Sequence, residues 1–506
     1  MQQKELISVL YDAKIVNEEY LSNPVTTIVN DNRLVEPGAC FIAIKGEKFD
    51  GHQVIHDVID KGAQILIVEQ LPEDAIHLKA TFVVVQSTYR AQAILANQFF
   101  NQPSTKLNVV AVTGTNGKTT TTNMISQLLE SLQHKTGVIG TMHYKVDKIY
   151  YPAVNTTPNA LELQKLFNEM VEAQCQDALI EASSHALALG RLWYTDIDCA
   201  IFTNLTREHL DFHKSMDNYA YAKSLLFSQL GQKFINGKPR LAILNIDDDY
   251  YKVMQQATSA EIVSYSLVSN QATAYASNIT EENGITIFDL QYKGEKHRVS
   301  LPMRGSYNVS NYLAAFLTLN KFYGYSIEEI IEATTYFKGV EGRMQAIDEG
   351  QDFEVVVDFA HTPDALERVL QELVKHKKEN QRIISLMGHS GGNRDSGMRQ
   401  PLGDILFKYS DEIVFTADNP RFEPVEKIVN EMIGTHENEH NPYSIIKDRA
   451  VAVEHAISIA RPNDIVLLAG KGGEPYQVIG DEKIPYDEVQ TVIDAIHRLK
   501  TNKGVN

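Results

Sequence analysis

The chain has 506 residues, enough for about three domains of ordinary size. It has a formal net charge of −18 at pH 7, with 43% apolar and 22% charged residues. This acidic composition argues against binding to a nucleic-acid backbone, which requires clustered Lys and Arg, and no stretch approaches the roughly 20 apolar residues that span a bilayer.

Two features of the sequence bear on localisation. The N-terminus lacks the apolar core of a signal peptide, and Cys40, Cys175 and Cys199 are scattered without metal-ligand spacing. We expect free thiols in a reducing, cytoplasmic protein without a membrane partner. The negative charge does not exclude anionic small substrates, because a few local basic groups suffice to bind a phosphate.

The first block, 1–105, alternates strand-like and helical patterns. Apolar runs at 40–44, 63–68 and 81–85 predict strands, and the spacing at 53–61 and 88–100 predicts helices. Residues 101–104 have the composition of a linker. The pattern predicts a small N-terminal α/β domain.

The second block, 106–337, opens on a phosphate-binding loop at 112–121. A predicted strand at 107–112 precedes it and a helical pattern around 123–129 follows it. Gly114 and Gly117 let backbone N–H groups face phosphates, Lys118 supplies a cation, and Thr119 supplies a hydroxyl for Mg²⁺. Val112 stands where the usual pattern has a glycine, so a glycine-rich turn with a chance lysine is the alternative.

Further strands are predicted in this block at 177–181, 199–203 and 241–245. The alternating polarity of 262–301 predicts antiparallel strands, and two helical segments close the block near 337. This is typical of a central nucleotide-binding domain built on a parallel sheet.

The third block, 338–506, has strand-like runs at 354–358, 382–386, 412–415 and 464–468 with helical patterns between them. This alternation predicts a doubly wound, Rossmann-like C-terminal domain. The fold class is therefore α/β, with three domains at 1–105, 106–337 and 338–506.

Polar residues follow several of the predicted strands, where an open parallel sheet binds its ligands. Glu181 and His209 are placed to bind a Mg²⁺ near the γ-phosphate, although a strand-end Glu is also typical of a helix N-cap or a surface ion pair. His213 is as consistent with a partly buried hydrogen-bonding histidine as with a ligand. By spacing alone, 470–474 is equally consistent with a plain glycine turn.

Taken together, short motifs in a fixed order resemble those of the Mur ligases over nearly the whole chain. The motifs lie at 114–120, 155–158, 181–185, 190–191, 204–213, 222–227, 308–311, 342–344, 358–364, 394–395, 418–421 and 470–474. The resemblance implies a uridine-nucleotide domain, an ATP domain and an amino-acid domain. It also implies that ATP activates the D-glutamate γ-carboxylate of UDP-MurNAc-L-Ala-D-Glu as an acyl phosphate, which an amino acid then attacks, in peptidoglycan synthesis, cell-wall biogenesis, cell shape and division.

The resemblance also assigns roles to residues of this chain. Lys118, Glu181, His209 and Lys223 correspond to catalytic residues, and Thr119, Glu181, His209 and a carbamylated Lys223 to Mg²⁺ ligands. The carbamate is implied to help hold a second Mg²⁺ with Glu181 and His209. Spacing alone favours a solvated helix lysine at position 223. The residues implied to bind ATP are Gly114, Thr115, Asn116, Gly117, Lys118, Thr119, Thr120, Asn308, Asn311, Arg343 and Asp358. Those implied to bind the UDP-sugar substrate are Asn32, Asn155, Thr156, Thr157, Ser183 and Arg191.

The run Asp418, Asn419, Pro420 and Arg421 resembles the form found in enzymes that add meso-diaminopimelate. A second carboxylate on that amino acid suits a bidentate guanidinium. The other implied amino-acid contacts are Arg394, Gly470 and Glu474, of which Glu474 could receive the distal ammonium.

Several positions differ from the family pattern. Asn32 replaces a serine, and Gly473 replaces a histidine. The sequence leaves open addition of lysine or another diamino acid, a related ligase with a different acceptor, and a non-catalytic nucleotide-binding regulator. A monomer is expected.

Overall fold

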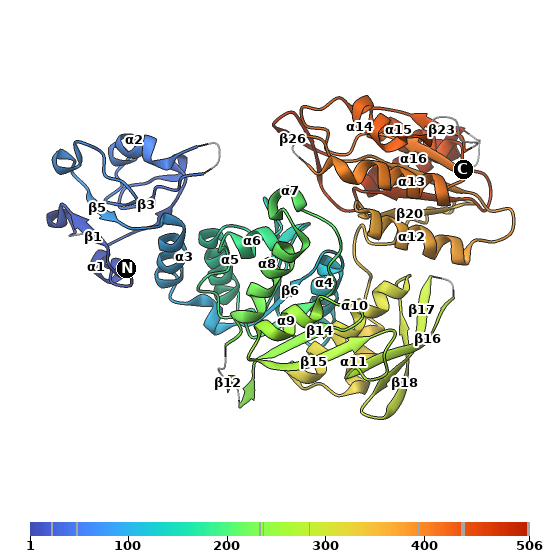
Figure 1. The fold of residues 1–506 in the computed structure, drawn as a ribbon, viewed down its shortest axis with the longest axis horizontal. Coiled ribbons are helices and arrows are strands. Elements are labelled where there is room, and N and C mark those ends of the chain that lie inside the picture. The colour runs from blue at the N-terminus through green and yellow to red at the C-terminus, as the bar shows by residue number, and fades with distance from the viewer. Residues whose placement is uncertain are drawn as a thin grey trace.

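The computed structural model describes residues 1–21, 24–46, 49–231, 234–235, 237–282, 284–392, 394–436 and 441–502. They form three units, each with its own sheet: an N-terminal, a central and a C-terminal unit (Figure 1). The two chain ends lie in different units, at opposite sides of the molecule (Figure 1).

The N-terminal unit contains a five-stranded sheet in the order β1-β5-β4-β3-β2. Its strands are parallel except for β1, which runs antiparallel to β5. Apolar residues of β3, β4 and β5 are buried, as expected for parallel strands covered on both faces. The elements are α1 (Gln3–Ile7), β1 (Lys14–Val16), β2 (Ile28–Val29), β3 (Cys40–Ile42), α2 (Ile55–Asp60), β4 (Ile65–Val68), β5 (Thr81–Val84) and α3 (Thr88–Phe99).

The central unit contains an eleven-stranded sheet in the order β18-β17-β16-β15-β14-β11-β6-β10-β7-β8-β9. Its parallel part has β6 in the middle, flanked by β10 and β11. The strands are β6 (Asn108–Thr113), β7 (Thr136–Ile139), β8 (His143–Val146), β9 (Ile149–Pro152), β10 (Asp177–Glu181), β11 (Cys199–Phe202), β14 (Leu241–Asn245), β15 (Glu261–Ser266), β16 (Ala274–Glu282), β17 (Ile285–Tyr292) and β18 (Glu295–Leu301).

Helices cover this sheet. Outside it, β12 (Phe234–Ile235) and β13 (Lys238–Pro239) form a separate two-stranded ribbon. α4 and α10 pack against each other, and their buried faces form one apolar core with strands of the sheet. The helices are α4 (Lys118–Ser131), α5 (Ala160–Glu172), α6 (Ser184–Ala188), α7 (Leu210–His213), α8 (Met216–Ser228), α9 (Tyr251–Ala257), α10 (Ser306–Leu317) and α11 (Ile327–Thr334).

The prediction of antiparallel strands over 262–301 is wrong for the first of them. β15 runs parallel to both β14 and β16, whereas β16, β17 and β18 are antiparallel. Alternating polarity reports which face of a strand is buried, and it does not encode strand direction.

The C-terminal unit contains a six-stranded sheet in the order β19-β20-β24-β21-β22-β23, parallel except for β19. This is the doubly wound arrangement that the sequence predicts. A hairpin of β25 and β26 lies beside it. The elements are β19 (Gln345–Ala346), β20 (Glu354–Asp358), α12 (Pro363–His376), β21 (Ile383–Met387), α13 (Arg399–Tyr409), β22 (Glu412–Phe415), α14 (Val425–Ile433), β23 (Tyr443–Ile445), α15 (Arg449–Ser458), β24 (Ile465–Ala469), β25 (Tyr476–Ile479), β26 (Glu482–Pro485) and α16 (Glu488–Asn502).

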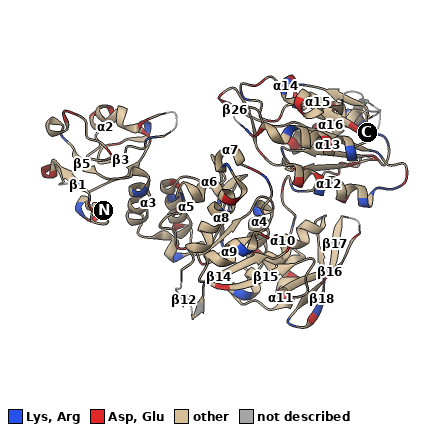
Figure 2. Cartoon of the chain, viewed as in Figure 1, with Lys and Arg blue, Asp and Glu red and all other residues tan. Residues whose placement is uncertain are grey.

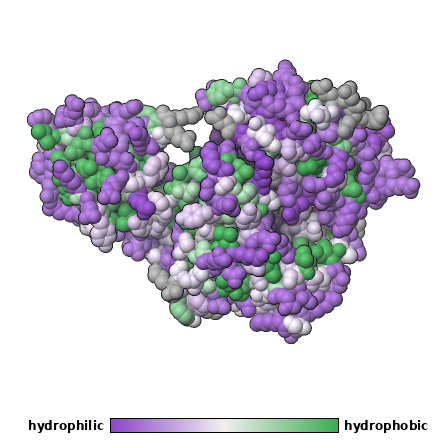
Figure 3. Space-filling view, in the orientation of Figure 1, coloured by the Kyte–Doolittle hydropathy of each residue, from purple (hydrophilic) through white to green (hydrophobic). Residues whose placement is uncertain are grey.

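Charged residues of both signs are interspersed over all three units (Figure 2). The face in Figure 3 is mostly hydrophilic, with small scattered hydrophobic areas. Cys40, Cys175 and Cys199 are free and buried, as expected. Among the described residues, no helix is both long and apolar enough to span a bilayer.

Candidate active site

The phosphate loop joins β6 to α4 and needs its two glycines. Gly117 has φ +87°, and a Cβ there would lie 2.5 Å from Asn311 Oδ1. A Cβ on Gly114 would lie 1.9 Å from Thr203 Oγ1. Because α4 begins at Lys118, the free N–H groups of its first turn, including that of Thr120, point toward the loop.

The loop is held in place by the segment after β11. The amide of Thr115 donates to Asn204 O at 2.8 Å, and the amide of Asn116 donates to Asn204 Oδ1 at 2.9 Å. β6, β10 and β11 are neighbours, so the segments that follow them meet at one edge of the sheet. The strand order thus explains why the predicted strand-end residues converge.

Lys118 lies inside the loop. Its Nζ donates to the carbonyl oxygens of Gly114 and Thr115 at 3.0 and 2.8 Å. Burial lowers the pKa of Lys118, while Glu208 and Glu181 oppose this shift. A phosphate in the loop would offer this ammonium a charged acceptor.

Glu181 is buried at the end of β10 and binds two threonines. Its Oε2 accepts from Thr119 Oγ1 and Thr141 Oγ1, both at 3.0 Å, and its Oε1 accepts from the Thr141 amide at 3.0 Å. Only 1% of Glu181 is exposed, and α6 is capped by Ser183, so Glu181 is neither a surface pair nor a helix cap. Thr141 was missed, since no sequence pattern marks the loop after β7.

Lys223 is buried on α8 rather than solvated, with 1% of the residue exposed. Its Nζ donates to Gly114 O at 2.7 Å and lies 4.6 Å from the centre of the Tyr219 ring. Burial, with Lys118 adding to it, lowers the pKa of Lys223 well below its ordinary value. This environment favours the neutral amine.

His209 precedes α7 and pairs with its neighbour Glu208, the Nε2–Oε1 distance being 3.4 Å. Burial lowers the pKa of His209. Glu208 also lies 3.2 Å from His361 Nε2, which belongs to the C-terminal unit. Burial raises the pKa of Glu208, but His209 and His361 outweigh burial and leave it well below its ordinary value.

Glu208 and His361 were missed as site residues. Each lies within a motif that marks the site, next to or near a predicted residue. His213 is buried, and its Nε2 lies 2.9 Å from Ser184 Oγ, which is the hydrogen-bonding arrangement left open by the sequence.

The predicted ATP residues beyond the loop come from α10 and from the start of the C-terminal unit. Asn311 Nδ2 donates to Asn308 Oδ1 at 3.0 Å, and Thr121 Oγ1 donates to Asn311 Oδ1 at 3.3 Å. Arg343 Nη2 donates to Thr119 Oγ1 at 3.0 Å and thus joins the two units at the loop.

Asp358 ends β20 and accepts from the amides of Met344 and Ala360, both at 2.7 Å. Burial raises the pKa of Asp358, against the opposing charge of Arg343. The Asp358 carboxylate therefore fixes the turn that carries Arg343.

Most of the predicted UDP-sugar residues form one hydrogen-bonded group. Thr157 Oγ1 donates to Glu181 O at 2.6 Å and lies 3.2 Å from Ser183 Oγ, and Arg191 Nη1 donates to Thr157 O at 2.8 Å. Thr156 Oγ1 lies 3.1 Å from Thr141 Oγ1, and the carbonyl of Asn155 accepts from Tyr144.

Asn32 belongs to the N-terminal unit instead, where its Nδ2 donates to Asp57 Oδ2 at 3.1 Å. It lies after β2 and does not contact the group around Glu181 in this arrangement.

Arg394 follows β21, and the other predicted amino-acid residues follow β22 and β24, which flank β21 in the C-terminal sheet. Asn419 Nδ2 donates to Glu474 Oε2 at 2.9 Å. Lys471, which was missed although it lies inside the 470–474 motif, is fully buried and donates to Glu474 Oε2 at 2.5 Å and to Asn419 Oδ1 at 3.0 Å. Ser390 Oγ donates to Asp418 Oδ2 at 2.7 Å.

Arg421 is half-buried, and its Nη1 donates only to the carbonyl of Gly391, at 3.1 Å, among the described contacts. Burial lowers the pKa of Arg421, and the neighbouring Arg394 adds to the shift. Arg394 is exposed, and Pro420 is buried. Gly470, with φ +98°, donates to Asp358 O at 3.1 Å and links the ends of β20 and β24.

A cavity of about 870 Å³ unites the central and C-terminal parts of the site. The predicted residues that line it are Thr115, Asn116, Gly117, Lys118, Thr119, Thr120, Asn155, Thr156, Glu181, Ser183, His209, Asn308, Asn311, Arg343, Asp358, Arg394, Asp418, Asn419, Arg421, Gly470 and Glu474. The predicted residues outside its lining are Asn32, Gly114, Thr157, Arg191, Lys223 and Pro420. Such a volume accommodates a nucleotide-sized ligand.

Three family models match the chain. They are the Mur ligase family catalytic domain over residues 24–100, the Mur ligase middle domain over 112–319, and the Mur ligase glutamate ligase domain over 342–472. Together the matched segments cover most of the sequence and fall in the three units described above.

Two similar proteins carry the same name. A UDP-N-acetylmuramoyl-L-alanyl-D-glutamate--2,6-diaminopimelate ligase of Bacillus cereus is 38% identical over 497 residues, covering 98% of each chain. The protein of that name from Lactiplantibacillus plantarum is also 38% identical over 497 residues, covering 98% of this chain and 99% of its own.

Solved structures agree in fold over nearly the full length. A structure of a UDP-N-acetylmuramoyl-L-alanyl-D-glutamate--2,6-diaminopimelate ligase matches with a TM-score of 0.66 and 30% identity, covering 98% of this chain and 99% of the other. The MurF ligase of Thermotoga maritima in complex with ADP matches with a TM-score of 0.65 and 17% identity, over 95% and 99% of the two chains. The latter likeness concerns the fold alone.

Proposed function

The chain belongs to the Mur ligase family, and we propose that it is an ATP-dependent ligase that joins meso-diaminopimelate to the D-glutamate γ-carboxylate of UDP-MurNAc-L-Ala-D-Glu. The observation that carries this proposal is the single cavity between the phosphate loop and the strand ends of the C-terminal unit. It lets a triphosphate, an acceptor carboxylate and an amino acid meet at one place.

The reaction has two steps. A carboxylate is a poor acyl donor, so one of its oxygens first takes the γ-phosphoryl group of ATP, and ADP leaves. The amino nitrogen then attacks the acyl carbon, phosphate leaves, and the amine loses a proton. The site must offset the repulsion between the γ-phosphate and the approaching carboxylate, chiefly by positioned charge.

Lys118 is the group that we assign to the phosphates. Its buried ammonium contacts loop carbonyls that a phosphate oxygen could replace. In a site shielded from water, one such cation stabilises developing negative charge more strongly than it would at the surface. Arg343, 3.0 Å from Thr119 Oγ1, is placed to add a second cation at the same phosphates.

The donor set around Thr119 suits Mg²⁺. The hydroxyl of Thr119 and the carboxylate of Glu181 are hard oxygen donors 3.0 Å apart at the loop. We assign Thr119, Glu181, His209 and a carbamylated Lys223 as the residues that would hold Mg²⁺, which when bound supplies positive charge beside the phosphates.

Carbamylation of Lys223 requires a neutral amine, and the burial of Lys223 favours that state. The amine nitrogen forms a bond to the carbon of CO₂, one C=O π bond breaks, and the nitrogen loses a proton. The product is a carboxylate-like anion. It places a negative charge near Lys118, where the unmodified amine would carry none, and so attracts cations.

Arg421 supports meso-diaminopimelate over lysine. It lines the cavity and, among the described residues, its guanidinium is hydrogen-bonded only to a backbone carbonyl, so it retains donors for a distal carboxylate. Glu474 already accepts from Lys471 and Asn419. An ammonium on the incoming amino acid would therefore join an existing hydrogen-bonded group.

The wider assignments follow from this reaction. We propose domains at 1–105, 106–337 and 338–506 that hold the uridine nucleotide, ATP and the amino acid. We also propose a monomeric, cytoplasmic enzyme of peptidoglycan synthesis that acts in cell shape, cell division and the cell cycle. Asn32, Asn155, Thr156, Thr157, Ser183 and Arg191 are assigned to the UDP-sugar substrate, and Asn308, Asn311 and Asp358 to ATP.

The test is phosphate release from ATP with UDP-MurNAc-L-Ala-D-Glu, Mg²⁺ and each candidate amino acid in turn. We expect the greatest turnover with meso-diaminopimelate. Equal or greater turnover with lysine would overturn the amino-acid assignment alone. Absence of turnover with every amino acid would favour a nucleotide-binding regulator.

A further inference from the structure

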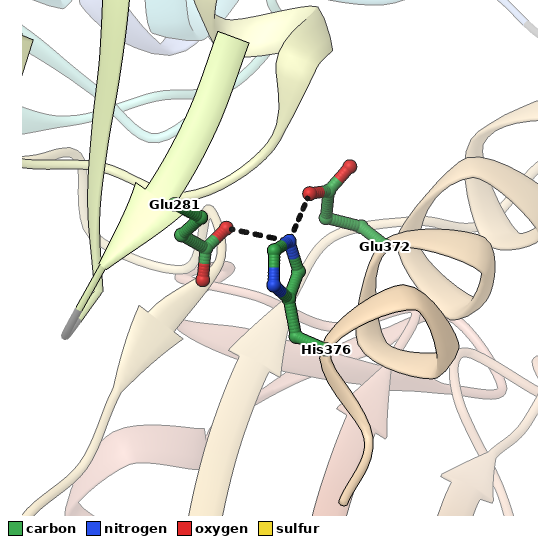
Figure 4. A group of neighbouring side chains, drawn as sticks. All are labelled: Glu281, Glu372 and His376. Carbon is green, nitrogen blue, oxygen red and sulfur yellow. Dashed lines mark hydrogen bonds and ion pairs between the residues drawn. The ribbon is translucent and has the colours of Figure 1, made fainter.

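A second group of ionisable side chains lies where the central and C-terminal units meet, outside the residues assigned to the reaction. Glu281 extends from β16, while Glu372 and His376 extend from α12, and the three side chains point toward one another (Figure 4). Their ligand-type atoms all lie within 4.8 Å of one another. In the described part of the chain this is the one such group of three His, Cys, Asp or Glu side chains.

The geometry of α12 explains why Glu372 and His376 lie together. Glu372 and His376 are four residues apart on α12, so they project from the same face one turn apart. His376 Nε2 lies 3.0 Å from Glu372 Oε1 and 3.6 Å from Glu281 Oε2. The ring nitrogen is thus the shared neighbour of two carboxylates from different units.

The group is incompletely satisfied by protein atoms. The Glu281 side chain is only 8% exposed, and its buried Oε2 has no hydrogen-bond partner among the described residues. The 3.6 Å separation from His376 is too long for a hydrogen bond, and an unpartnered buried carboxylate oxygen is costly. Burial raises the pKa of Glu281, although His376 and Arg304 oppose the shift.

We propose that Glu281, Glu372 and His376 bind a divalent transition-metal ion of the zinc class. One imidazole nitrogen and two carboxylate oxygens form a mixed donor set that such ions accept. Three protein ligands also leave a coordination position for water. An ion would give Glu281 Oε2 a directly bonded partner, where it now has only the 3.6 Å ion-pair contact to His376.

The spacing of the donors fits this assignment. With metal–ligand bonds of about 2.0–2.1 Å, neighbouring ligands of a tetrahedral ion lie about 3.3 Å apart. The distances of 3.0 and 3.6 Å from His376 Nε2 to the two carboxylate oxygens lie on either side of that value. The third separation, between the Glu281 and Glu372 oxygens, is within 4.8 Å, so closing the set around an ion requires these flexible side chains to move toward one another.

Two cations stand close to the group and must be accommodated. Arg304 Nε lies 3.3 Å from Glu281 Oε1, and Arg304 also pairs with Glu354. That contact uses the other carboxylate oxygen and leaves Oε2 for the ion. Lys375 Nζ lies 3.8 Å from Glu372 Oε1, but its side chain is 54% exposed and can turn away.

A bound ion would join α12 to β16 across the boundary between the two units. Glu372 also lines the cavity of the candidate active site. The site would hold one side of that cavity closed, and it uses none of the residues assigned to phosphates, Mg²⁺ or the amino acid.

The experiment titrates the metal-stripped full chain with Zn²⁺ by equilibrium dialysis, and with Co²⁺ by visible absorption of the tetrahedral ion. The variants are Glu281→Gln and His376→Ala. His497→Ala is the control, because His497 also pairs with a glutamate, Glu349, but on an exposed surface. Ions bound by histidines other than His376 and His497 contribute equally to all four proteins.

We expect the wild type and His497→Ala to bind one more equivalent than Glu281→Gln and His376→Ala, or to bind it at least tenfold more tightly. Equal binding by all four proteins, or no binding by the wild type, would overturn the proposal. Thermal unfolding checks each variant, and Glu281→Gln, which keeps the side-chain shape, decides the matter if His376→Ala is unstable. Phosphate release without added Zn²⁺ tests the ligase assignment separately.

Discussion

At the residue scale, the half-buried Lys118 and the buried Lys223 share one backbone acceptor. Lys118 Nζ and Lys223 Nζ donate to the carbonyl of Gly114, at 3.0 and 2.7 Å. Burial lowers the pKa of both lysines, and the charge of Lys118 lowers that of Lys223 further. Two ammonium groups so close are unfavourable, and conversion of Lys223 to an anion would remove the conflict.

Replacement of Lys118 tests the phosphate assignment. We expect Lys118→Met to lower the rate of phosphate release at least a hundredfold, since a buried cation beside the phosphates is lost. Lys135→Met is the control, because that lysine is half-exposed and pairs with Asp147. A Lys118→Met rate within a few-fold of wild type would contradict the assignment.

Carbamylation of Lys223 predicts that the activity of a variant can be restored chemically. Lys223→Ala should lose activity, and short-chain carboxylic acids should restore part of it by occupying the vacated space with a carboxylate. Lys252→Ala, at an exposed lysine of α9 paired with Asp249, should be active and unresponsive to the acids. If a folded Lys223→Ala protein stays inactive at every acid concentration, carbamylation is the wrong explanation.

Arg421 is expected to select the amino acid. Arg421→Ala should raise the KM for meso-diaminopimelate about tenfold or more, from the loss of a charge-assisted contact worth ~1.5–3 kcal/mol. The KM for lysine, which lacks the distal carboxylate, should change little and serves as the internal control. An unchanged KM for meso-diaminopimelate would assign Arg421 another role.

At the element scale, the candidate site depends on strand ends that are held by a buried ion pair. Arg449 at the start of α15 and Glu488 at the start of α16 form a fully buried pair at 2.5 Å. Arg449 also donates to the carbonyls of Ala417 and Ala469, each at 3.1 Å. These carbonyls directly precede Asp418 and Gly470, so one side chain ties together the ends that follow β22 and β24.

Loss of that pair should destabilise the C-terminal unit. We expect Arg449→Met to lower the free energy of unfolding by about 3–5 kcal/mol, because Glu488 is left buried without its partner. Arg498→Ala is the matched control, since Arg498 and Glu454 form an exposed pair between the same two helices and should contribute less than about 1 kcal/mol. Denaturant unfolding measures both, and similar effects of the two substitutions would contradict this view.

At the scale of the whole molecule, the central and C-terminal units jointly build the cavity. Arg343 reaches Thr119, and Asn116 Nδ2 donates to Asp364 Oδ2 at 3.2 Å. The cavity is therefore a property of both units together. Asn32, in contrast, lies in the N-terminal unit outside its lining.

ATP and the UDP-sugar substrate are assigned to different units. Substitutions in these units should therefore change the KM of one substrate and not of the other. We expect Arg343→Ala to raise the KM for ATP about tenfold, since its contact to a charged phosphate is worth ~1.5–3 kcal/mol, and to leave the KM for the UDP-sugar substrate nearly unchanged. Asn32→Ala should have the opposite selectivity, with a smaller effect for a neutral hydrogen bond. Parallel changes in both constants would argue against separate nucleotide sites.

Most buried strands could be predicted from the sequence, and some short ones could not. The strands at 177–181, 241–245, 354–358 and 412–415 occur at the predicted residues, because each is a continuous buried apolar run. The hairpin of β8 and β9 was missed, since β9 has only four residues, all exposed, and therefore no alternation of buried and exposed positions. The direction of β15 was misjudged because partner strands, and not its own residues, decide it.

The sequence by itself determined the phosphate loop, the α/β class and the family resemblance, because these depend on residue types at short, fixed spacings. Only the tertiary structure decided that Glu208 meets His361, that Lys471 binds Glu474 while buried, and that Glu281 faces His376. Such contacts depend on how separate elements pack and on which side chains lose water together. Neither the burial of a charged side chain nor the partner of a distant charge can be read from local spacing.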